Sequence, residues 1–411
     1  MELKKAALVL ALTGLLAWAI LSASLAISDR LAMEELVLPG SSKPVSICYG
    51  GGSIWVLDAD GGLILRIDPS SREVVGQAEI PGEVVLGGKP VSLAGFVPTS
   101  MIWAYDRIWI AGLGLRDVVL LAFEPSKGTW SAVGMPRSPA GGFTGGWCVA
   151  SGRGSIWTLV DVGEVYLVEV DPGTTSVKAI YGGLPGGTSI CYGAGCVWVL
   201  HTFVRVGPYG PTETSQVFRF NVAQRRLSLF TSRNGRSSVI FARGDRLYLG
   251  FTPSYGFTCV LEFDAVKGEF LGSHGTVPGV MSLLRALLVD DEGNIWFSQP
   301  GYFGVCGKRV WSTGLAVNSM CDVPGRGEVW LCGEEGSVGK VLVVSGRGLA
   351  GALCVGFPTY IMGLPSSFLL PVLTALASLA TYALVDFVVG RMRFKKWLRE
   401  RRARPSEDKT F

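Results

Sequence analysis

The stretch Gly52-Ser53-Ile54-Trp55, followed thirteen residues after the tryptophan by Asp68-Pro69, decides the fold of this chain. Two short runs of β-branched, aliphatic and aromatic residues, 54–57 and 63–67, predict two strands. An Asp- and Gly-rich turn at 58–62 separates them, and a second turn at 68–71 closes the unit. One such unit predicts only a hairpin, so the architecture depends on how often the unit recurs.

The unit recurs seven times, each copy centred on an aromatic residue of its second strand: Trp55, Trp109, Trp157, Trp198, Tyr248, Trp296 and Trp330. A short strand precedes each aromatic residue. A third strand follows it, in most repeats ending in an acidic or amide residue. Units of four short strands every 40–50 residues or so are typical of β-propeller blades. We therefore predict an all-β fold, a β-propeller of seven four-stranded blades. An open solenoid is the alternative, and it would need capped ends.

The closing strand of the ring is predicted at 35–38, before the first full repeat. It would form the outer strand of the last blade, beside the third strand of that blade at 340–344. Residues 352–355 are the competing candidate. Six or eight blades remain alternatives, because the sixth repeat is eroded.

Two repeats depart from the pattern. The fourth carries an insertion at 204–215 between its second and third strands, and interrupting loops of this kind often carry function. The sixth shortens after Trp296 into a Gly-rich stretch at 301–308, which predicts a poor third strand.

The two ends of the chain read as membrane segments. Residues 6–27 are uncharged and follow Lys4 and Lys5, and as a helix they would extend about 33 Å, enough for a bilayer core of roughly 30 Å. A cleaved signal peptide, with small residues at 24–26, is the alternative. The apolar run 368–389 precedes a basic cluster that marks the cytoplasmic side.

The predicted organisation therefore places the propeller outside the cell membrane and both termini in the cytoplasm. The segments are a cytoplasmic N-terminus (1–5), a transmembrane helix or signal anchor (6–27), the extracytoplasmic propeller (28–362), a second transmembrane helix (363–390) and a basic cytoplasmic tail (391–411). The propeller segment has 26 Lys and Arg against 28 Asp and Glu, so the net charge of +4 comes from the ends. This balance argues against a nucleic-acid partner.

The segment Asp291-Glu-Gly-Asn-Ile-Trp-Phe-Ser298 resembles the repeat phrase Gly-Asn-Ile-Trp-Phe-Thr-Glu of the streptogramin lyase family (virginiamycin B lyase-like proteins). The other repeats match its Gly-x-Ile-Trp core, and their Ile-Asp-Pro endings are similar to those of YVTN-type propellers. As a pattern the resemblance covers most of residues 40–350; as a specific motif it covers one blade. It implies a seven-bladed propeller and an elimination that opens an ester-linked ring at a His and Glu cluster with a divalent metal.

Three polar residues stand at one repeat position, three residues after the aromatic: Asp58, His201 and Gln299. We expect them to face one mouth of the propeller as ligand-binding candidates. Gln299 replaces the Glu of the family phrase, and a neutral amide can neither act as a base nor bring charge to a hard cation. We therefore predict no catalytic residue and no metal ligand. A divalent metal near these three residues belongs only to the lyase alternative.

Four aromatic residues on or beside the first strands, Tyr49, Trp103, Trp147 and Tyr192, are further ligand-binding candidates. Exposed in the channel, they would stack on a sugar or another flat ligand. Cys191 and Cys196 flank a four-residue turn, and they are the candidate disulfide.

The predicted function is a membrane-anchored binding or scaffold module that recognises a surface protein, a polymer such as a polysaccharide, or a small ligand. Nothing in the sequence requires catalysis. One alternative is a metal-dependent lyase or hydrolase of the streptogramin lyase type. Another is a receptor subunit that signals through a membrane partner, because the tail 391–411 contains no domain of its own.

Overall fold

The computed structural model describes residues 33–41, 43–114, 118–134, 145–161, 163–207, 210–254, 256–277, 281–345, 360–361 and 364–365. The repeats fall within one compact unit, Ala32–Ala350. In the other unit the described residues are the short strands β30 (Tyr360–Ile361) and β31 (Leu364–Pro365). No helix in the described ranges has the length and apolar character needed to span a bilayer. Apart from residues 364–365, the predicted membrane segments 6–27 and 363–390 lie outside those ranges.

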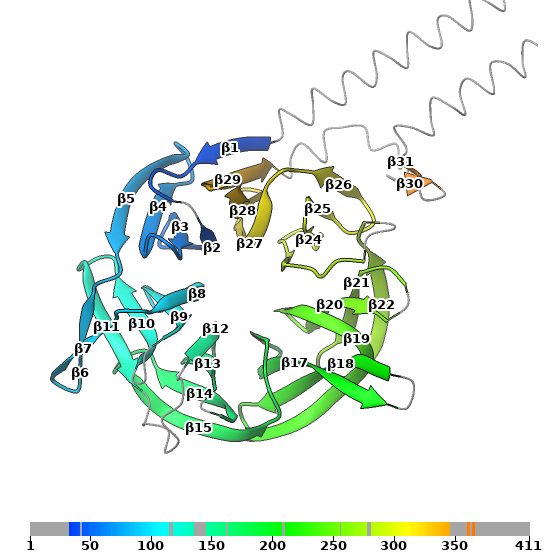
Figure 1. The fold of residues 1–411 in the computed structure, drawn as a ribbon, viewed down its shortest axis with the longest axis horizontal. Helices are drawn as coiled ribbons and strands as arrows, with labels where there is room; N and C mark the ends of the chain where they lie inside the picture. The colour runs from blue at the N-terminus through cyan, green and yellow to red at the C-terminus, as the bar shows by residue number, and fades with distance from the viewer. Residues whose placement is uncertain are drawn as a thin grey trace, which may run out of the picture. The chain divides into compact units, whose positions relative to one another are not determined.

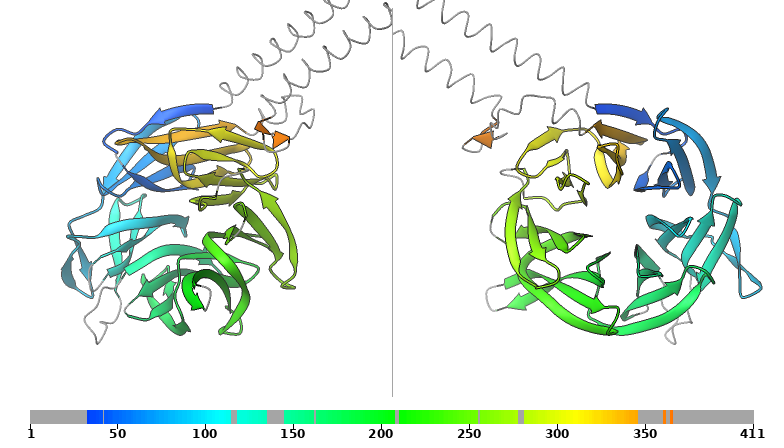
Figure 2. Two further views of the ribbon diagram at one scale, coloured as in Figure 1. Left: turned by 45° about the vertical axis from the view of Figure 1, so that its right-hand side comes forward. Right: turned by 180° about the vertical axis from the view of Figure 1, so that it is seen from behind.

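The repeats form a β-propeller, in which blades of antiparallel strands surround a central axis (Figures 1 and 2). The strand pairings in the described part divide into seven groups of four, which confirms the all-β propeller prediction. Blade 1 consists of β2 (Pro44–Gly50), β3 (Ser53–Asp58), β4 (Leu63–Asp68) and β5 (Glu73–Glu79). Blade 2 consists of β8 (Val97–Ala104), β9 (Arg107–Leu113), β10 (Val118–Glu124) and β11 (Thr129–Gly134). Blade 3 consists of β12 (Gly145–Gly152), β13 (Ser155–Asp161), β14 (Val165–Asp171) and β15 (Ser176–Leu184).

Blades 4 and 5 share one long strand, β19 (Arg226–Arg243), whose first part is the outer strand of blade 4 and whose second part is the inner strand of blade 5. Blade 4 also contains β16 (Ser189–Gly193), β17 (Cys196–Gly207) and β18 (Gly210–Asn221). Blade 5 continues with β20 (Arg246–Pro253), β21 (Cys259–Asp264) and β22 (Phe270–Gly275). Blade 6 consists of β23 (Ala286–Val289), β24 (Ile295–Gln299), β25 (Tyr302–Val305) and β26 (Arg309–Ser312).

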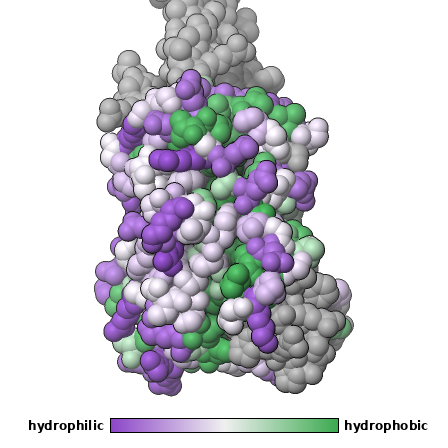
Figure 3. Space-filling model, turned by 90° about the vertical axis from the view of Figure 1, so that its left-hand side faces the viewer, coloured by the Kyte–Doolittle hydropathy of each residue, from purple (hydrophilic) through white to green (hydrophobic). Residues whose placement is uncertain are grey.

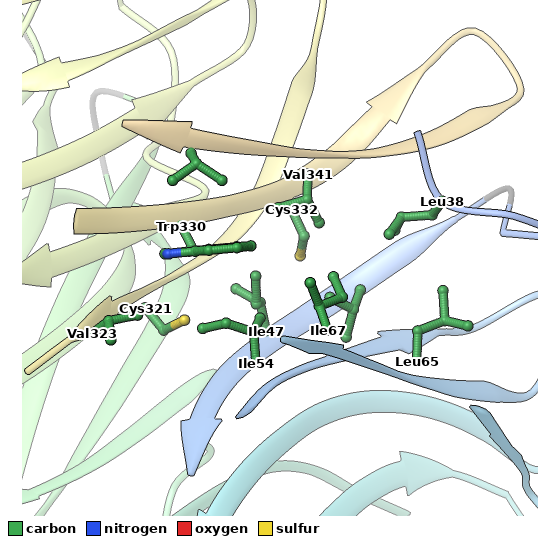
Figure 4. Packing of buried hydrophobic residues seen from close by; sticks show 12 residues of the cluster. Leu38, Ile47, Ile54, Leu65, Ile67, Cys321, Val323, Trp330, Cys332 and Val341 are labelled. Carbon is green, nitrogen blue, oxygen red and sulfur yellow. The ribbon is translucent and has the colours of Figure 1, made fainter. Parts of the chain in front are cut away.

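The last blade closes the ring with the first strand of the described chain. Blade 7 consists of β27 (Ala316–Val323), β28 (Glu328–Glu335), β29 (Val338–Ser345) and β1 (Met33–Val37). β1 pairs antiparallel with β29, which confirms the predicted closing strand. Its competitor at 352–355 lies outside the described residues. Trp330, Cys321 and Cys332 of blade 7 pack on Ile47 and Ile54 of blade 1, so an apolar layer seals the junction (Figure 4).

Two irregular repeats are more regular than the sequence predicts. The expected insertion at 204–215 is a continuation of β17 and β18, which stay paired to the end at Gly207 and Gly210. The expected poor third strand of blade 6 is a regular one, β25, because Tyr302–Val305 pairs on both edges. A further hairpin, β6 (Glu83–Leu86) and β7 (Lys89–Ser92), lies between blades 1 and 2 and packs Leu86 against Gly134.

The outer strands have one face toward solvent. Along β5 the residues alternate between exposed and half-buried, the period expected for a strand with one solvated face. The side of the ring that contains blades 1 and 2 accordingly mixes hydrophilic and hydrophobic residues (Figure 3).

The recurrent tryptophan is a core residue, as predicted. In four blades its indole N–H donates a hydrogen bond of 3.0–3.2 Å to the carbonyl oxygen five residues earlier, at the end of the preceding strand. In blade 6 the acceptor is the carboxylate of Asp290, at 2.8 Å. Because a buried donor without a partner is costly, this bond allows an indole to fill the space between blades.

The aspartates that end several third strands stabilise the turns that follow. Asp68, Asp171 and Asp264 each accept two backbone N–H bonds through one carboxylate oxygen, from residues two and three positions later. These bonds hold the pKa of each carboxyl below its usual value of 3.8. In blade 4, Asn221 makes the equivalent bond to the N–H of Gln224 without a charge.

We expect the acid sensitivity of the fold to depend partly on these three turns. A depressed folded pKa contributes stability above the unfolded value, and that contribution is lost as the pH falls through the folded value. Replacing Asp68, Asp171 and Asp264 together by asparagine should flatten the decline of the urea midpoint between about pH 5 and pH 2, while keeping the turns. If the urea midpoint declines with pH equally steeply in the variant and in the parent chain, these turns do not contribute to the acid sensitivity.

Candidate functional site

The inner strands carry a bulge at one repeat position, and the bulged residue reaches toward the next blade. In blades 2, 5 and 7 the register shifts at Thr99, Ser238 and Asn318. Their side chains donate hydrogen bonds of 3.0, 2.5 and 3.0 Å to backbone carbonyls of the following blade or of the segment just before its first strand. A bulge re-aims the side chain that it carries, so this position links neighbouring blades that share few backbone hydrogen bonds.

Other hydroxyl groups join adjacent blades near the axis. The hydroxyl of Ser46 bonds to the backbone of Met101, and that of Thr202 donates to the carbonyl of Ser237. Two further hydroxyl links join Ser298 to Val317 and Ser319 to Ile47.

Blade 3 differs because its bulge contains a tryptophan. The register of β12 shifts between Gly146 and Val149, around Trp147. The Trp147 indole N–H donates a 2.9 Å hydrogen bond to the carbonyl of Gly187, in the connection between blades 3 and 4. A large flat side chain therefore replaces a short hydroxyl at this junction.

A pocket of about 680 Å³ opens beside Trp147. Its walls come from the turn after β13, the connection from β15 to β16, and the middle of β17. The lining residues are Trp147, Asp161, Gly163, Glu164, Val165, Gly183, Leu184, Pro185, Gly186, Gly187, Thr188, His201 and Thr202. Glu164, Pro185 and Thr188 are exposed, whereas Val165 and Leu184 are buried, so the pocket has a solvated rim and an apolar base.

His201 forms one wall of the pocket. Its ring stacks on Phe203, with centroids 5.2 Å apart and planes 13° apart. A Cβ on Gly186 would lie only 2.3 Å from the imidazole, so this connection needs glycine. Burial lowers the pKa of His201 below 6.5, which keeps the ring neutral at neutral pH. Among the described residues, neither ring nitrogen has a hydrogen-bond partner, so a neutral donor and acceptor remain for a ligand.

Two carboxylates also line the pocket. Asp161 accepts a 2.8 Å hydrogen bond from the N–H of Gly163, and Glu164 accepts one of 3.0 Å from the hydroxyl of Tyr166. Glu164 raises the pKa of Tyr166, so the phenol stays a donor. The described residues that line the pocket include no lysine or arginine. The arrangement can bind a polar or charged group against an aromatic surface.

The predicted triad at one mouth of the propeller is wrong for two of its three members. Asp58 is fully buried, where its carboxylate accepts bonds from the hydroxyl of Ser41 and the N–H groups of Lys43 and Gly61. Gln299 is also fully buried, and its amide N–H₂ donates to Ser282. Both side chains are used inside the fold, and only His201 lines the pocket.

These positions do not fit the divalent metal that the lyase alternative implies. Asp58 already uses both oxygens as acceptors inside the protein, and Gln299 brings no charge. Within the described ranges, no group of three His, Cys, Asp or Glu side chains could hold a metal ion.

Of the four predicted aromatic residues, Trp147 alone lines the pocket. Trp103 and Tyr192 fill space between blades: a Cβ on Gly50 would lie 1.8 Å from Trp103, and one on Gly152 would lie 2.1 Å from Tyr192. Tyr49 packs against the core cluster between blades 1 and 7. The sequence places these residues on inner strands correctly, but it does not show which of them the next blade covers.

The predicted disulfide is not formed. Cys191 and Cys196 are free, and the strand register sets Cys191 opposite Trp198 and Cys196 opposite Gly193. Burial raises the pKa of both thiols.

Sequence reasoning missed the carboxylates and the Gly-rich wall of the pocket. Counting three residues past Trp157 reaches Val160, one residue short of Asp161. The more informative position lies ten residues before the repeat aromatic, where Trp147 stands in blade 3, Thr99 in blade 2 and Ser238 in blade 5.

Comparison with known proteins supports the fold alone. No protein-family model and no curated protein matches the chain. Among solved structures, a streptogramin B lyase is similar, with a TM-score of 0.53 and 14% identity over 76% of this chain and 97% of that one. A chain in a mitotic checkpoint complex is similar with a TM-score of 0.50 and 10% identity, over 76% and 91% of the two chains. At these identities the likeness extends to the propeller and not to its chemistry.

Proposed function

We propose that this chain is a membrane-anchored binding module, displayed outside the cell, whose ligand site is the pocket between blades 3 and 4. One observation carries the proposal: Trp147 and His201, from different blades, line one cavity, and the ring nitrogens of His201 have no hydrogen-bond partner among the described residues. Concave sites with an aromatic wall and a few placed polar groups are the usual form of small-ligand sites.

The membrane part of the proposal rests on the sequence. Residues 6–27 and 368–389 are long enough to span a bilayer, and the basic residues flank them on one side. A propeller tethered in this way would present its pocket to solutes, polymers or proteins outside the membrane.

A labelling experiment with an introduced cysteine tests display and access together. In Thr188→Cys the new thiol stands at the exposed rim of the pocket. Background from the described native cysteines should be low, because thiolate is the reactive form and burial raises the pKa of Cys48 to about 12 and those of Cys148, Cys306 and Cys332 further.

We expect a membrane-impermeant maleimide to label Thr188→Cys on intact cells at least several-fold above the parent chain. Ser406→Cys, in the predicted cytoplasmic tail, should react only after permeabilisation. Labelling of Thr188→Cys only after permeabilisation would refute external display. If the thiol stays unreactive even then, the pocket is closed to solutes and is not the ligand site.

A further inference from the structure

The two carboxylates of the pocket have no cationic partner in the described part of the chain. Asp161 and Glu164 take part in no ion pair there, and their hydrogen bonds come from a backbone N–H and a tyrosine hydroxyl. The equivalent turn of blade 1 is different, because Lys43 stands 3.8 Å from the carboxylate of Asp60. The pocket therefore holds two negative charges that no lysine or arginine neutralises within the described ranges.

The other described residues of the pocket add no positive charge. None of the described lining residues is a lysine or arginine, and His201 is neutral at neutral pH. A neutral ligand that covered the carboxylates would remove water from two charges and return no counter-charge, which is unfavourable. A ligand that carries a positive charge would offset part of this negative charge.

The lining of the pocket suits a cation on an apolar stem. Trp147 presents an aromatic surface, and ring faces attract ammonium groups. Val165, Leu184 and Pro185 supply aliphatic contacts beside it. An ammonium group could thus lie near the carboxylates while its carbon stem packs against the indole and these side chains.

We infer that the pocket is a site for an organic ammonium group, borne either by a free amine or by a lysine side chain. The inference names the ligand class of the site proposed above and rests on that proposal. The chemistry of recognition is the same for both sources: two carboxylates for the charge, and an aromatic and aliphatic surface for the stem.

The test uses the full-length chain labelled with fluorotryptophan and observed by ¹⁹F NMR. The chain has 12 tryptophans, and the resonance lost in Trp147→Phe identifies the one in the pocket. The probes are 2-phenylethylammonium and its neutral analogue 2-phenylethanol. A third probe is the tripeptide acetyl-Gly-Lys-Gly-amide, which separates a lysine source from a free amine.

We expect 2-phenylethylammonium to shift the Trp147 resonance in the millimolar range or below, and 2-phenylethanol to bind at least several-fold more weakly. Asp161→Asn and Glu164→Gln keep the acceptor oxygens of the turn and remove one charge each. Each variant should weaken ammonium binding about fivefold without changing binding of the alcohol. Asp60→Asn, in the matching turn of blade 1, should leave ammonium binding unchanged.

The outcomes separate the two proposals. If the ammonium and the alcohol bind equally, and the carboxylate variants have no effect, the pocket remains a ligand site but the inference of a cation is wrong. If neither amine probe shifts the Trp147 resonance, the inference is also overturned. Maleimide labelling of Thr188→Cys still tests whether the propeller is displayed outside the cell and whether solutes reach the pocket. Binding of the tripeptide but not of the free amine would show that the ammonium group belongs to a lysine side chain. Binding of the free amine but not of the tripeptide would show that the ligand is a free amine.

Discussion

Replacing Trp198 with alanine should lower the free energy of unfolding by about 3–5 kcal/mol, the cost of emptying a large buried aromatic site. Trp198 is fully buried, and its ring meets Phe230 edge-on at 4.9 Å. Its indole N–H donates a 3.0 Å hydrogen bond to the carbonyl of Gly193. The substitution removes the packing and leaves that carbonyl without its side-chain donor.

Urea denaturation, followed by tryptophan fluorescence and far-UV circular dichroism, measures this loss. Trp198→Tyr is the matched control, because Tyr248 occupies the equivalent position in blade 5 and is itself buried. We expect the tyrosine variant to lose less than half as much as the alanine variant. If Trp198→Ala does not fold, the loss in free energy of unfolding measured for Trp198→Tyr still tests the prediction. A loss below about 1 kcal/mol for the alanine variant would show that the recurrent aromatic residue is not a main support of the blades.

The second large effect concerns the contact between blades 3 and 4. A Cβ on Gly152 would lie 2.1 Å from the ring of Tyr192, closer than real side chains approach. Gly152→Ala should therefore destabilise the fold by about 1–3 kcal/mol through overpacking.

A double-mutant cycle tests the stated cause. In a Tyr192→Ala background the clash is absent, so Gly152→Ala should cost only a few tenths of a kcal/mol there. Tyr192→Phe keeps the ring and should retain the full cost. An equal cost of Gly152→Ala in all three backgrounds would contradict the clash.

The fold is readable from the sequence because blades are local structures. The Ile-Trp phrase, the turn after it and the acidic end of the third strand lie within about twenty residues of each other, so each blade is visible as a repeat. The closing strand is also predictable, since a ring without free edges needs a partner for the outer side of β29.

The candidate site is predictable only in part. Trp147 and His201 are among the predicted ligand-binding residues, and the structure brings them to one pocket. Asp58 and Gln299 share the repeat position of His201, yet they serve the interior. A position in a repeat fixes where a residue lies on its blade, whereas its exposure depends on the neighbouring blade and connection.

The sequence by itself determined the all-β class, the repeated blade, the aromatic core position and the closing strand. The reason is that strand periodicity and turn chemistry act between residues close in the chain. Only the tertiary structure decided that Trp147 and His201 line one pocket together with the carboxylates of Asp161 and Glu164, while Trp103 and Tyr192 pack against glycines. Those contacts join different blades, so they depend on the fit of side chains across each junction, and no local pattern records that fit.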